Sequence, residues 1–320
     1  MLQTFQATLS PMLVMFLCIV IGFVLKKANL LPDSAGTVMS KLENYVFVPA
    51  LIIHTFMNYC TVASLTDQYS LILYSIVALL LGISIAIPLS KVFSKNDAYR
   101  RNVYKYALTF GNFAFMGNAI VPAILESVDP EILYKYMLYT LPLNLMVYTW
   151  GIVILIPAGE NKGGFLKKLL NPVCVSILLG ALLGLIGAEA YVPSFLLTVV
   201  NYCKGCMAPV AMILTGFVIG GYRLFDLLKN TRVYVATVLR LFVIPALILT
   251  VLYLLGASDT VMILTLFAFA TPLGMNTVVF PAAYGGETHT GASMAMISHT
   301  LCVVSIPLMY SLLTWILALI

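Results

Sequence analysis

The chain has 320 residues, of which 62% are hydrophobic and 9% are charged, and its mean hydropathy is +1.03. A soluble domain carries about a quarter charged residues, so these values exclude a water-facing globular surface and predict a polytopic protein embedded in a lipid bilayer. The net charge of +5 comes from basic residues scattered through short loops, which argues against nucleic acid as a partner.

Ten apolar runs of about 20 residues follow one another along the chain and predict spanning helices, so the expected fold is all-α. No basic flank precedes the first run and no small-residue cleavage site follows it, so we expect a retained helix rather than a signal peptide. Little chain remains between the runs, which leaves no room for a separate soluble domain. The runs are 6–25, 36–58, 70–90, 104–125, 132–156, 172–188, 194–220, 233–255, 260–283 and 291–319.

The loops between the expected helices alternate in charge. Because basic loops stay in the cytoplasm, this alternation places both termini outside a cell (plasma or inner) membrane. The loop between the ninth and tenth helices, with Glu287 and His289, is expected in the cytoplasm but lacks basic residues. The basic residues follow the first, third, fifth and seventh helices: Lys26, Lys27; Lys91, Lys95, Arg100, Arg101, Lys105; Lys162, Lys167, Lys168; Arg223, Lys229, Arg232.

Prolines recur at an offset of about half the chain, which indicates an internal repeat. Five spans in each copy is an odd number, so the second copy enters the membrane from the opposite side. We therefore expect two inverted five-helix repeats, residues 1–160 and 161–320, as in many secondary transporters. The paired prolines are Pro11/Pro172, Pro32/Pro193, Pro49/Pro209, Pro88/Pro245, Pro122/Pro281 and Pro142/Pro307.

The fourth helix of each expected repeat carries helix-breaking residues at mid-span. Residues 110–122 read FGNFAFMGNAIVP and residues 271–281 read TPLGMNTVVFP, with Pro122, Pro272 and Pro281 as the expected break points. A broken helix exposes half-helix ends, of which the N-terminal ends attract anions and the freed carbonyls hold cations. Kinked packing helices are the alternative, but two breaks at related positions favour a binding site lined by both.

Few charged residues lie deep inside the expected spans. Glu43 and Lys204 occupy similar places in the two halves, and a lone charge at mid-bilayer costs at least about 3 kcal/mol, so we expect the two to form an intramembrane ion pair. Separate snorkelling to the membrane surface is the alternative. His299, in the tenth expected helix, is a candidate proton relay or a packing residue. No metal-ligand cluster, nucleotide loop or nucleophile arrangement is recognisable, so we expect no cofactor and no enzyme.

At the two interrupted helices the sequence resembles the auxin efflux carrier family, which includes the plant PIN carriers and many bacterial permeases. Residues 111–117 (GNFAFMG) are similar to that family's helix 4 motif, and residues 272–276 (PLGMN) with 284–286 (YGG) are similar to its helix 9 region. Residues 298–307 resemble the start of its last helix, so the resemblance covers the whole chain. Ala119 departs from it, since family members usually have proline there.

The resemblance implies a scaffold of helices 1, 2, 6 and 7, often dimeric, and a mobile block of helices 3–5 and 8–10 in which helices 4 and 9 cross. Family members carry small organic anions, including dicarboxylates and auxin, by moving that block past the scaffold. By position, two asparagines are expected to bind the substrate carboxylate, glycines to let backbone approach it, and neighbouring polar residues to complete the site. These residues are Asn112, Asn276, Gly111, Gly117, Gly274, Asn118 and Thr277.

A secondary transporter of a small carboxylated solute, working by alternating access, is therefore the function we expect. One alternative is a sodium- or proton-coupled symporter of the bile-acid type, with carbonyls, asparagine and Thr277 holding the ion. Another is a channel, which needs no moving block. The lack of a soluble output domain argues against a receptor, and a single deep carboxylate argues against an intramembrane enzyme.

Overall fold

The structure is a computed structural model that describes residues 1–94, 96–156, 171–283 and 285–319. Apart from one isolated bridge, the regular structure within these residues is helical. Four of the lysines in the basic loops (Lys95, Lys162, Lys167, Lys168) and Tyr284 of the family motif lie outside the described residues.

Six of the described helical segments are long and apolar enough to cross a membrane. They are α1 (Leu2–Lys27), α4 (Val62–Phe93), α7–η3–α8 (Ile132–Leu155), α11 (Ser194–Gly220), α13–η5–α14 (Thr231–Leu254) and α17 (His289–Leu317). The shorter elements are α2 (Ala35–Leu42), η1 (Glu43–Phe47), α3 (Val48–Tyr59), α5 (Ala98–Thr109), η2 (Phe113–Gly117), α6 (Asn118–Leu125), α10 (Pro172–Leu185), η4 (Ala188–Tyr191), α12 (Leu224–Leu228), α15 (Asp259–Phe269) and α16 (Asn276–Ala283). Within the long segments, η3 spans Val147–Gly151 and η5 spans Leu239–Val243.

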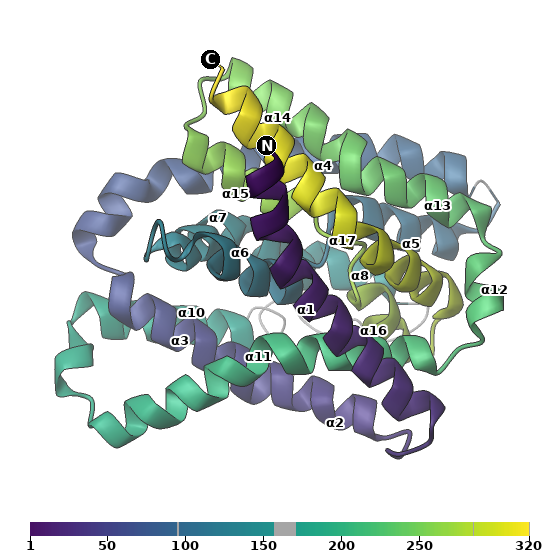
Figure 1. Cartoon of the computed structure of the whole chain (residues 1–320), viewed down its shortest axis with the longest axis horizontal. Helices are drawn as coiled ribbons and strands as arrows, with labels where there is room; N and C mark the ends of the chain where they lie inside the picture. Colours follow the sequence, from purple (N-terminus) through teal and green to yellow (C-terminus); the bar gives the residue numbers. More distant parts are fainter. Residues whose placement is uncertain (95, 157–170, 284, 320) are drawn as a thin grey trace.

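Helix α1 packs along α11, and α3 packs against both α10 and α11. Helices α3, α10 and α11 lie together in the lower part of Figure 1, and α1 runs across the molecule from the upper part of the view down to α11. The contact between α1 and α11 is close because each helix presents a glycine to the other's backbone. A Cβ on Gly216 would lie 1.8 Å from the Ile19 carbonyl oxygen, and a Cβ on Gly22 would lie 1.9 Å from that of Ile213. Small residues of this kind let helix backbones approach in a membrane.

Two π-helical turns coincide with the deep charged residues and with prolines. Glu43 begins η1, and Arg240 lies in η5; each turn is followed by a helix with proline near its first residue, Pro49 in α3 and Pro245 in α14. Proline lacks a donor and its ring crowds the carbonyl four residues earlier, so the preceding turn widens. The sequence pattern predicted helix here but not the wide turns.

The two interrupted helices break where the sequence predicted and cross at the break. The backbone N–H of Asn112, between α5 and η2, donates to the Pro272 carbonyl between α15 and α16 (2.7 Å), and Gly111 bridges to Leu273 in the antiparallel sense. Pro272 lies in its break. The expectation for Pro122 and Pro281 was wrong, because both lie inside half-helices, in α6 and α16. Pro122 is the fifth of the eight residues of α6 and Pro281 the sixth of the eight of α16, so each half-helix continues past its proline.

Candidate functional site: a polar cavity at the helix crossing

A cavity of about 240 Å³ lies beside the crossing. Its wall combines the breaks of both interrupted helices with residues of α2, η1, α7, η3, α10 and α11. The described lining contains amides and hydroxyls but no carboxylate. The residues of the wall on which the site depends are Ser40, Asn44, Gly111, Asn112, Phe113, Asn144, Tyr148, Leu214, Gly274, Met275, Asn276 and Phe280.

Asn112 lies in the wall of this cavity, 4% exposed, and its orientation is set by His299. The Nδ1 of His299 lies 2.7 Å from the Ala295 carbonyl oxygen and must donate to it. The other ring nitrogen, Nε2, therefore accepts from the Asn112 amide Nδ2, 3.0 Å away. One N–H of that amide donates to His299. The second N–H and the carbonyl oxygen are the other groups through which this side chain can form hydrogen bonds. His299 thus positions Asn112.

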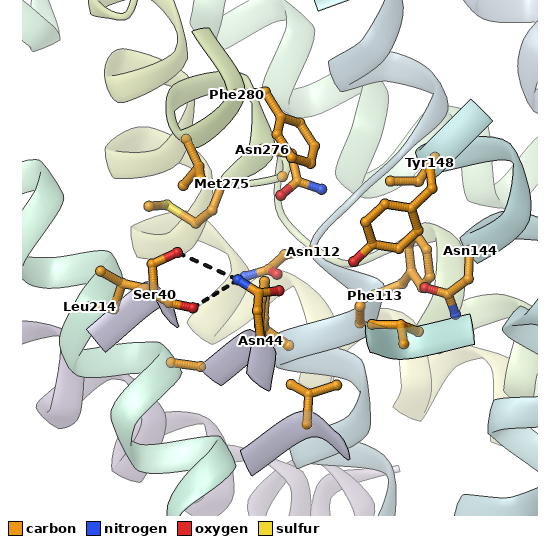
Figure 2. Close-up of a pocket in the computed structure, with 18 of the residues that line it drawn as sticks. Ser40, Asn44, Asn112, Phe113, Asn144, Tyr148, Leu214, Met275, Asn276 and Phe280 are labelled. Carbon is orange, nitrogen blue, oxygen red and sulfur yellow. Dashed lines mark hydrogen bonds between the residues drawn. The ribbon is translucent and has the colours of Figure 1, made fainter. Parts of the chain in front are cut away.

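Asn276, the first residue of α16, lies across the crossing from Asn112 in the same cavity (Figure 2). Its amide Nδ2 donates to the Tyr106 hydroxyl on α5, 2.8 Å away. Each of the two asparagines is therefore held by a side chain of another helix, one on α17 and one on α5.

The half-helix N-terminal ends face this cavity. Asn112 precedes η2 and Asn276 begins α16, so the first residues of both half-helices belong to the wall. The N-terminal end of a helix carries a partial positive charge of roughly half an elementary charge. An anion in the cavity would meet two such ends and two amides without meeting a buried carboxylate.

Two glycines of the predicted set belong to this wall because the crossing is tight. A Cβ on Gly111 would lie 2.4 Å from the Thr271 Oγ1 and 2.6 Å from an Arg240 nitrogen, Nη2. A Cβ on Gly274 would lie 3.3 Å from the Gly111 carbonyl oxygen. Only small residues allow the two breaks to approach this closely.

Three residues of the predicted set do not line this cavity, which corrects their assignment to its wall. A Cβ on Gly117 would collide with the Tyr136 hydroxyl, so this glycine serves packing against α7. Asn118 lines a small neighbouring cavity of about 20 Å³, which shares Asn144 and Val173 with the wall of the first. The Thr277 hydroxyl is fully buried and donates to the Gly274 carbonyl, 2.9 Å away.

The expected Glu43–Lys204 pair is not formed, and this prediction was wrong. The Lys204 ammonium lies 3.1 Å from the His54 ring nitrogen Nε2, while both Glu43 carboxyl oxygens are buried without a hydrogen-bond partner among the described residues. Similar depth along two helices does not decide which helix faces meet. His54, in the same half of the chain as Glu43, presents the nearer partner.

Arg240 is a fully buried residue of the crossing that the sequence reasoning left out of the site. Its guanidinium Nη1 donates to the carbonyls of Leu108 and Thr109, both at 3.1 Å, and Nη2 donates to that of Ala268 at 3.3 Å. These carbonyls belong to the last turns of α5 and α15. The position of Arg240 in the sequence, deep in an expected span with no acidic residue nearby, was the signal that could have identified it.

Six further polar residues of the wall were also missing from the predicted site: Ser40, Asn44, Tyr45, Asn144, Tyr148 and Thr215. The Asn44 Nδ2 donates to the Ser40 carbonyl at 2.8 Å, which a dashed line marks in Figure 2. The Asn144 Nδ2 donates in the same way to the Thr140 carbonyl at 3.1 Å. The Tyr148 hydroxyl points toward the side of the cavity where Asn112 and Phe113 lie (Figure 2). Asparagine in a span is equally suited to joining helices, so the sequence did not distinguish these roles.

A second cavity of about 510 Å³ adjoins the first, since Ser40, Leu214 and Val279 line both. Its wall holds Lys26 and Lys41. Lys26 forms an ion pair with Asp33, whose pKa is lowered by the hydrogen bond from this ammonium group and by its charge. Two basic residues therefore line the cavity that adjoins the one at the crossing.

Comparison with known proteins identifies the class of this one. The profile of a family described as "Membrane transport protein" matches residues 7–163 and 161–310, which together cover nearly the whole chain. An "Uncharacterized transporter" of Methanothermobacter thermautotrophicus is 22% identical over 314 residues, which are 95% of this chain and 98% of that protein. The protein is a multi-pass membrane transporter, a class distinct from enzymes. It belongs to this membrane transport protein family, the auxin efflux carrier family that its interrupted helices resemble.

Proposed function

We propose that the protein is a secondary transporter that carries a small organic anion, such as a carboxylate, by alternating access around the crossing. The observation that carries the proposal is the shared cavity wall, in which the N-terminal ends of two half-helices stand together with the amides of Asn112 and Asn276. Two partial positive charges and neutral donors favour an anion without the cost of a buried charged side chain.

The cavity also limits the size and shape of the solute. A volume of about 240 Å³ is near the low end of small-molecule sites, which suits a solute with few non-hydrogen atoms. Phe113, Met275 and Phe280 form an apolar part of the wall beside the amides (Figure 2). A carboxylate at the amides with a small apolar body against these side chains fits this division.

We also propose the architecture that the transport cycle requires. In it, ten spans form two inverted repeats, residues 1–160 and 161–320. The scaffold consists of α1, the α2–η1–α3 run, α10 and α11, and these helices also form the contact of a homodimer. The other helices form a mobile block that slides past the scaffold, which is an elevator-type mechanism. The close packing of α1 on α11 and of α3 on α10 supports a rigid scaffold.

The proposed topology gives the path to the cavity a direction. With both termini outside the plasma or inner membrane, the C-terminal end of α1 and the basic residues Lys26 and Lys41 lie at the cytoplasmic face. The larger cavity that they line then opens the crossing to the cytoplasm. Lysines at the opening attract an anion before it reaches the amides.

Equilibrium binding to purified protein tests the proposal. We expect one or more of labelled succinate, malate and indole-3-acetate to bind, and Asn112→Ala and Asn276→Ala each to weaken binding at least about tenfold, because each removes a hydrogen bond to a charged group. Asn201→Ala is the matched control, since Asn201 is an exposed residue of α11 away from the cavity. Unchanged binding in both site variants would contradict the site; binding of amines or neutral solutes but of none of the three carboxylates would contradict the solute class.

A further inference from the structure

Arg240 is held at the crossing by main-chain carbonyls and an aromatic ring. The side chain is 0% exposed, and its hydrogen bonds to the described residues all go to main-chain carbonyls, those of Leu108, Thr109 and Ala268. Its guanidinium carbon lies 5.4 Å from the centre of the Phe269 ring. No carboxylate lies within ion-pair distance of it in the described part of the chain.

A buried guanidinium without a carboxylate needs another source of negative charge, because an uncompensated charge is costly inside a membrane. The last turns of α5 and α15 supply it. The C-terminal end of a helix carries roughly half a negative elementary charge, so two such ends together offset about one positive charge. Arg240 is the point at which both ends meet.

The same place in a crossing of broken helices has a known chemical use. In carriers built from inverted repeats, half-helix C-terminal ends and unwound carbonyls hold the coupling cation, sodium or a proton. In this chain the guanidinium fills that space. The ideal Cβ position of Gly111 lies only 2.6 Å from Nη2, so the backbone of the break lies directly against Arg240.

We propose that Arg240 is a resident cation that permanently occupies the cation position of the crossing. It neutralises the half-helix C-terminal ends as a bound sodium ion would, and it leaves the carbonyls of Leu108, Thr109 and Ala268 unavailable to a metal ion. A guanidinium keeps its proton in proteins and is tethered to η5, so it does not leave during a cycle. The crossing therefore needs no sodium ion, and transport is not driven by a sodium gradient.

Arg240 is a positioning residue in this account, because it does not line the cavity. Gly111 connects the two sides: it belongs to the cavity wall and also lies against the guanidinium. The half-helix ends of the crossing are thus used in opposite ways, with the N-terminal ends facing the cavity and two C-terminal ends facing Arg240. This inference goes beyond the proposed function, and its test needs no organic anion.

Thermal unfolding of purified protein in different cations tests the proposal. We expect the wild-type Tm to be the same in sodium, lithium and choline chloride at equal ionic strength. Arg240→Ala exposes the three carbonyls in an otherwise similar crossing. Its Tm is expected to fall, and then to rise by a few degrees with sodium relative to choline, and with millimolar guanidinium chloride, because ligands stabilise the folded state that they bind.

Two comparisons separate this role from ordinary packing. Millimolar urea has the shape of guanidinium without its charge and is expected to leave the Tm of Arg240→Ala unchanged. Arg232→Ala removes another arginine from the same helical segment, one that donates to the Phe93 carbonyl at 2.8 Å, outside the crossing, and is expected to show no cation-specific recovery.

A sodium-specific rise in the wild-type Tm would overturn the proposal, and so would an Arg240→Ala protein that responds to cations no more than Arg232→Ala does. If Arg240→Ala does not fold, Arg240→Lys and Arg240→Met provide the comparison, since they are of similar size and differ in charge. We expect a larger yield of folded Arg240→Lys; an equal or larger yield of Arg240→Met would overturn the proposal.

Discussion

At the scale of single residues, the site depends on side chains that hold other side chains. Tyr106 is fully buried on α5, and its hydroxyl accepts from the Asn276 amide at 2.8 Å. His299 does the same for Asn112 with a ring nitrogen that its own helix forces to be the acceptor. Neither tyrosine nor histidine needs to touch the solute in order to affect its binding, because each fixes which way an amide faces.

Tyr106→Phe should therefore weaken anion binding while leaving the protein folded. The variant removes the acceptor of one amide hydrogen bond, whose net value is about 1 kcal/mol, so we expect about fivefold weaker binding. Tyr139→Phe is the matched control: it removes a buried hydrogen bond to Thr265 (2.8 Å) outside the cavity, and should lower the Tm without changing the Kd. Equal Kd values for Tyr106→Phe and wild type would show that Tyr106 does not position Asn276.

The sequence was sufficient to locate the two breaks, because glycine, asparagine and proline in a span mark a break whatever surrounds it. The family resemblance added Asn112 and Asn276, which line the cavity, and their binding of a solute stays a prediction. The sequence was not sufficient for Arg240 or Tyr106. Their roles arise only where the ends of α5 and α15 meet, and the partners are far apart along the chain. The Glu43–Lys204 prediction failed for the same reason, since position along a helix does not give the neighbour that each side chain meets.

At the scale of elements, the crossing is a tightly packed part of the fold. The Asn112 N–H to Pro272 carbonyl bond and the Gly111–Leu273 bridge join the two breaks directly, and Arg240 closes one side. The sequence predicted both breaks but misplaced the role of Pro122 and Pro281, which lie inside short half-helices. The π-helical turns η1 and η5 were not predictable from hydropathy, since an apolar period does not distinguish a wide turn from a regular one.

Gly111→Ala should destabilise the protein, because its methyl group has to displace Thr271, Arg240 or the backbone. Overpacking of this kind costs about 1–3 kcal/mol, so we expect a clearly lower Tm and reduced binding. Gly205→Ala on α11, where a Cβ meets nothing within 4 Å, should leave the Tm unchanged or raise it. If Gly111→Ala and Gly205→Ala had the same Tm, the crossing would have room for a Cβ at Gly111, contrary to the structure.

At the scale of the whole molecule, the proposed path to the cavity depends on which side of the membrane each end of the chain occupies. Figure 1 shows the start of α1 and the end of α17 in the upper part of the view, and the cavity with Lys26 and Lys41 lies by the other end of α1. Loop charge predicted the sidedness from the sequence, although part of the basic loops lies outside the described residues. Hydropathy predicted where the helices lie, since apolar length is a property of each segment by itself.

Labelling with an impermeant thiol reagent tests this sidedness. In a background without the six natural cysteines, we expect Leu319→Cys to react from the outside of intact cells. Thr37 is an exposed residue in the wall of the larger cavity. Thr37→Cys should react in inverted vesicles, whose cytoplasmic face is turned outward, but not in intact cells. Labelling of both positions from the same side would rule out the proposed topology.

Uptake into proteoliposomes measures whether the crossing binds an organic anion and carries it across the membrane. We expect wild-type protein to accumulate whichever of labelled succinate, malate or indole-3-acetate binds most tightly, and Asn201→Ala to do the same. Asn112→Ala and Asn276→Ala, reconstituted in equal folded amounts, should show no uptake above empty liposomes. Wild-type rates in both site variants would show that the solute does not cross the membrane at these two asparagines.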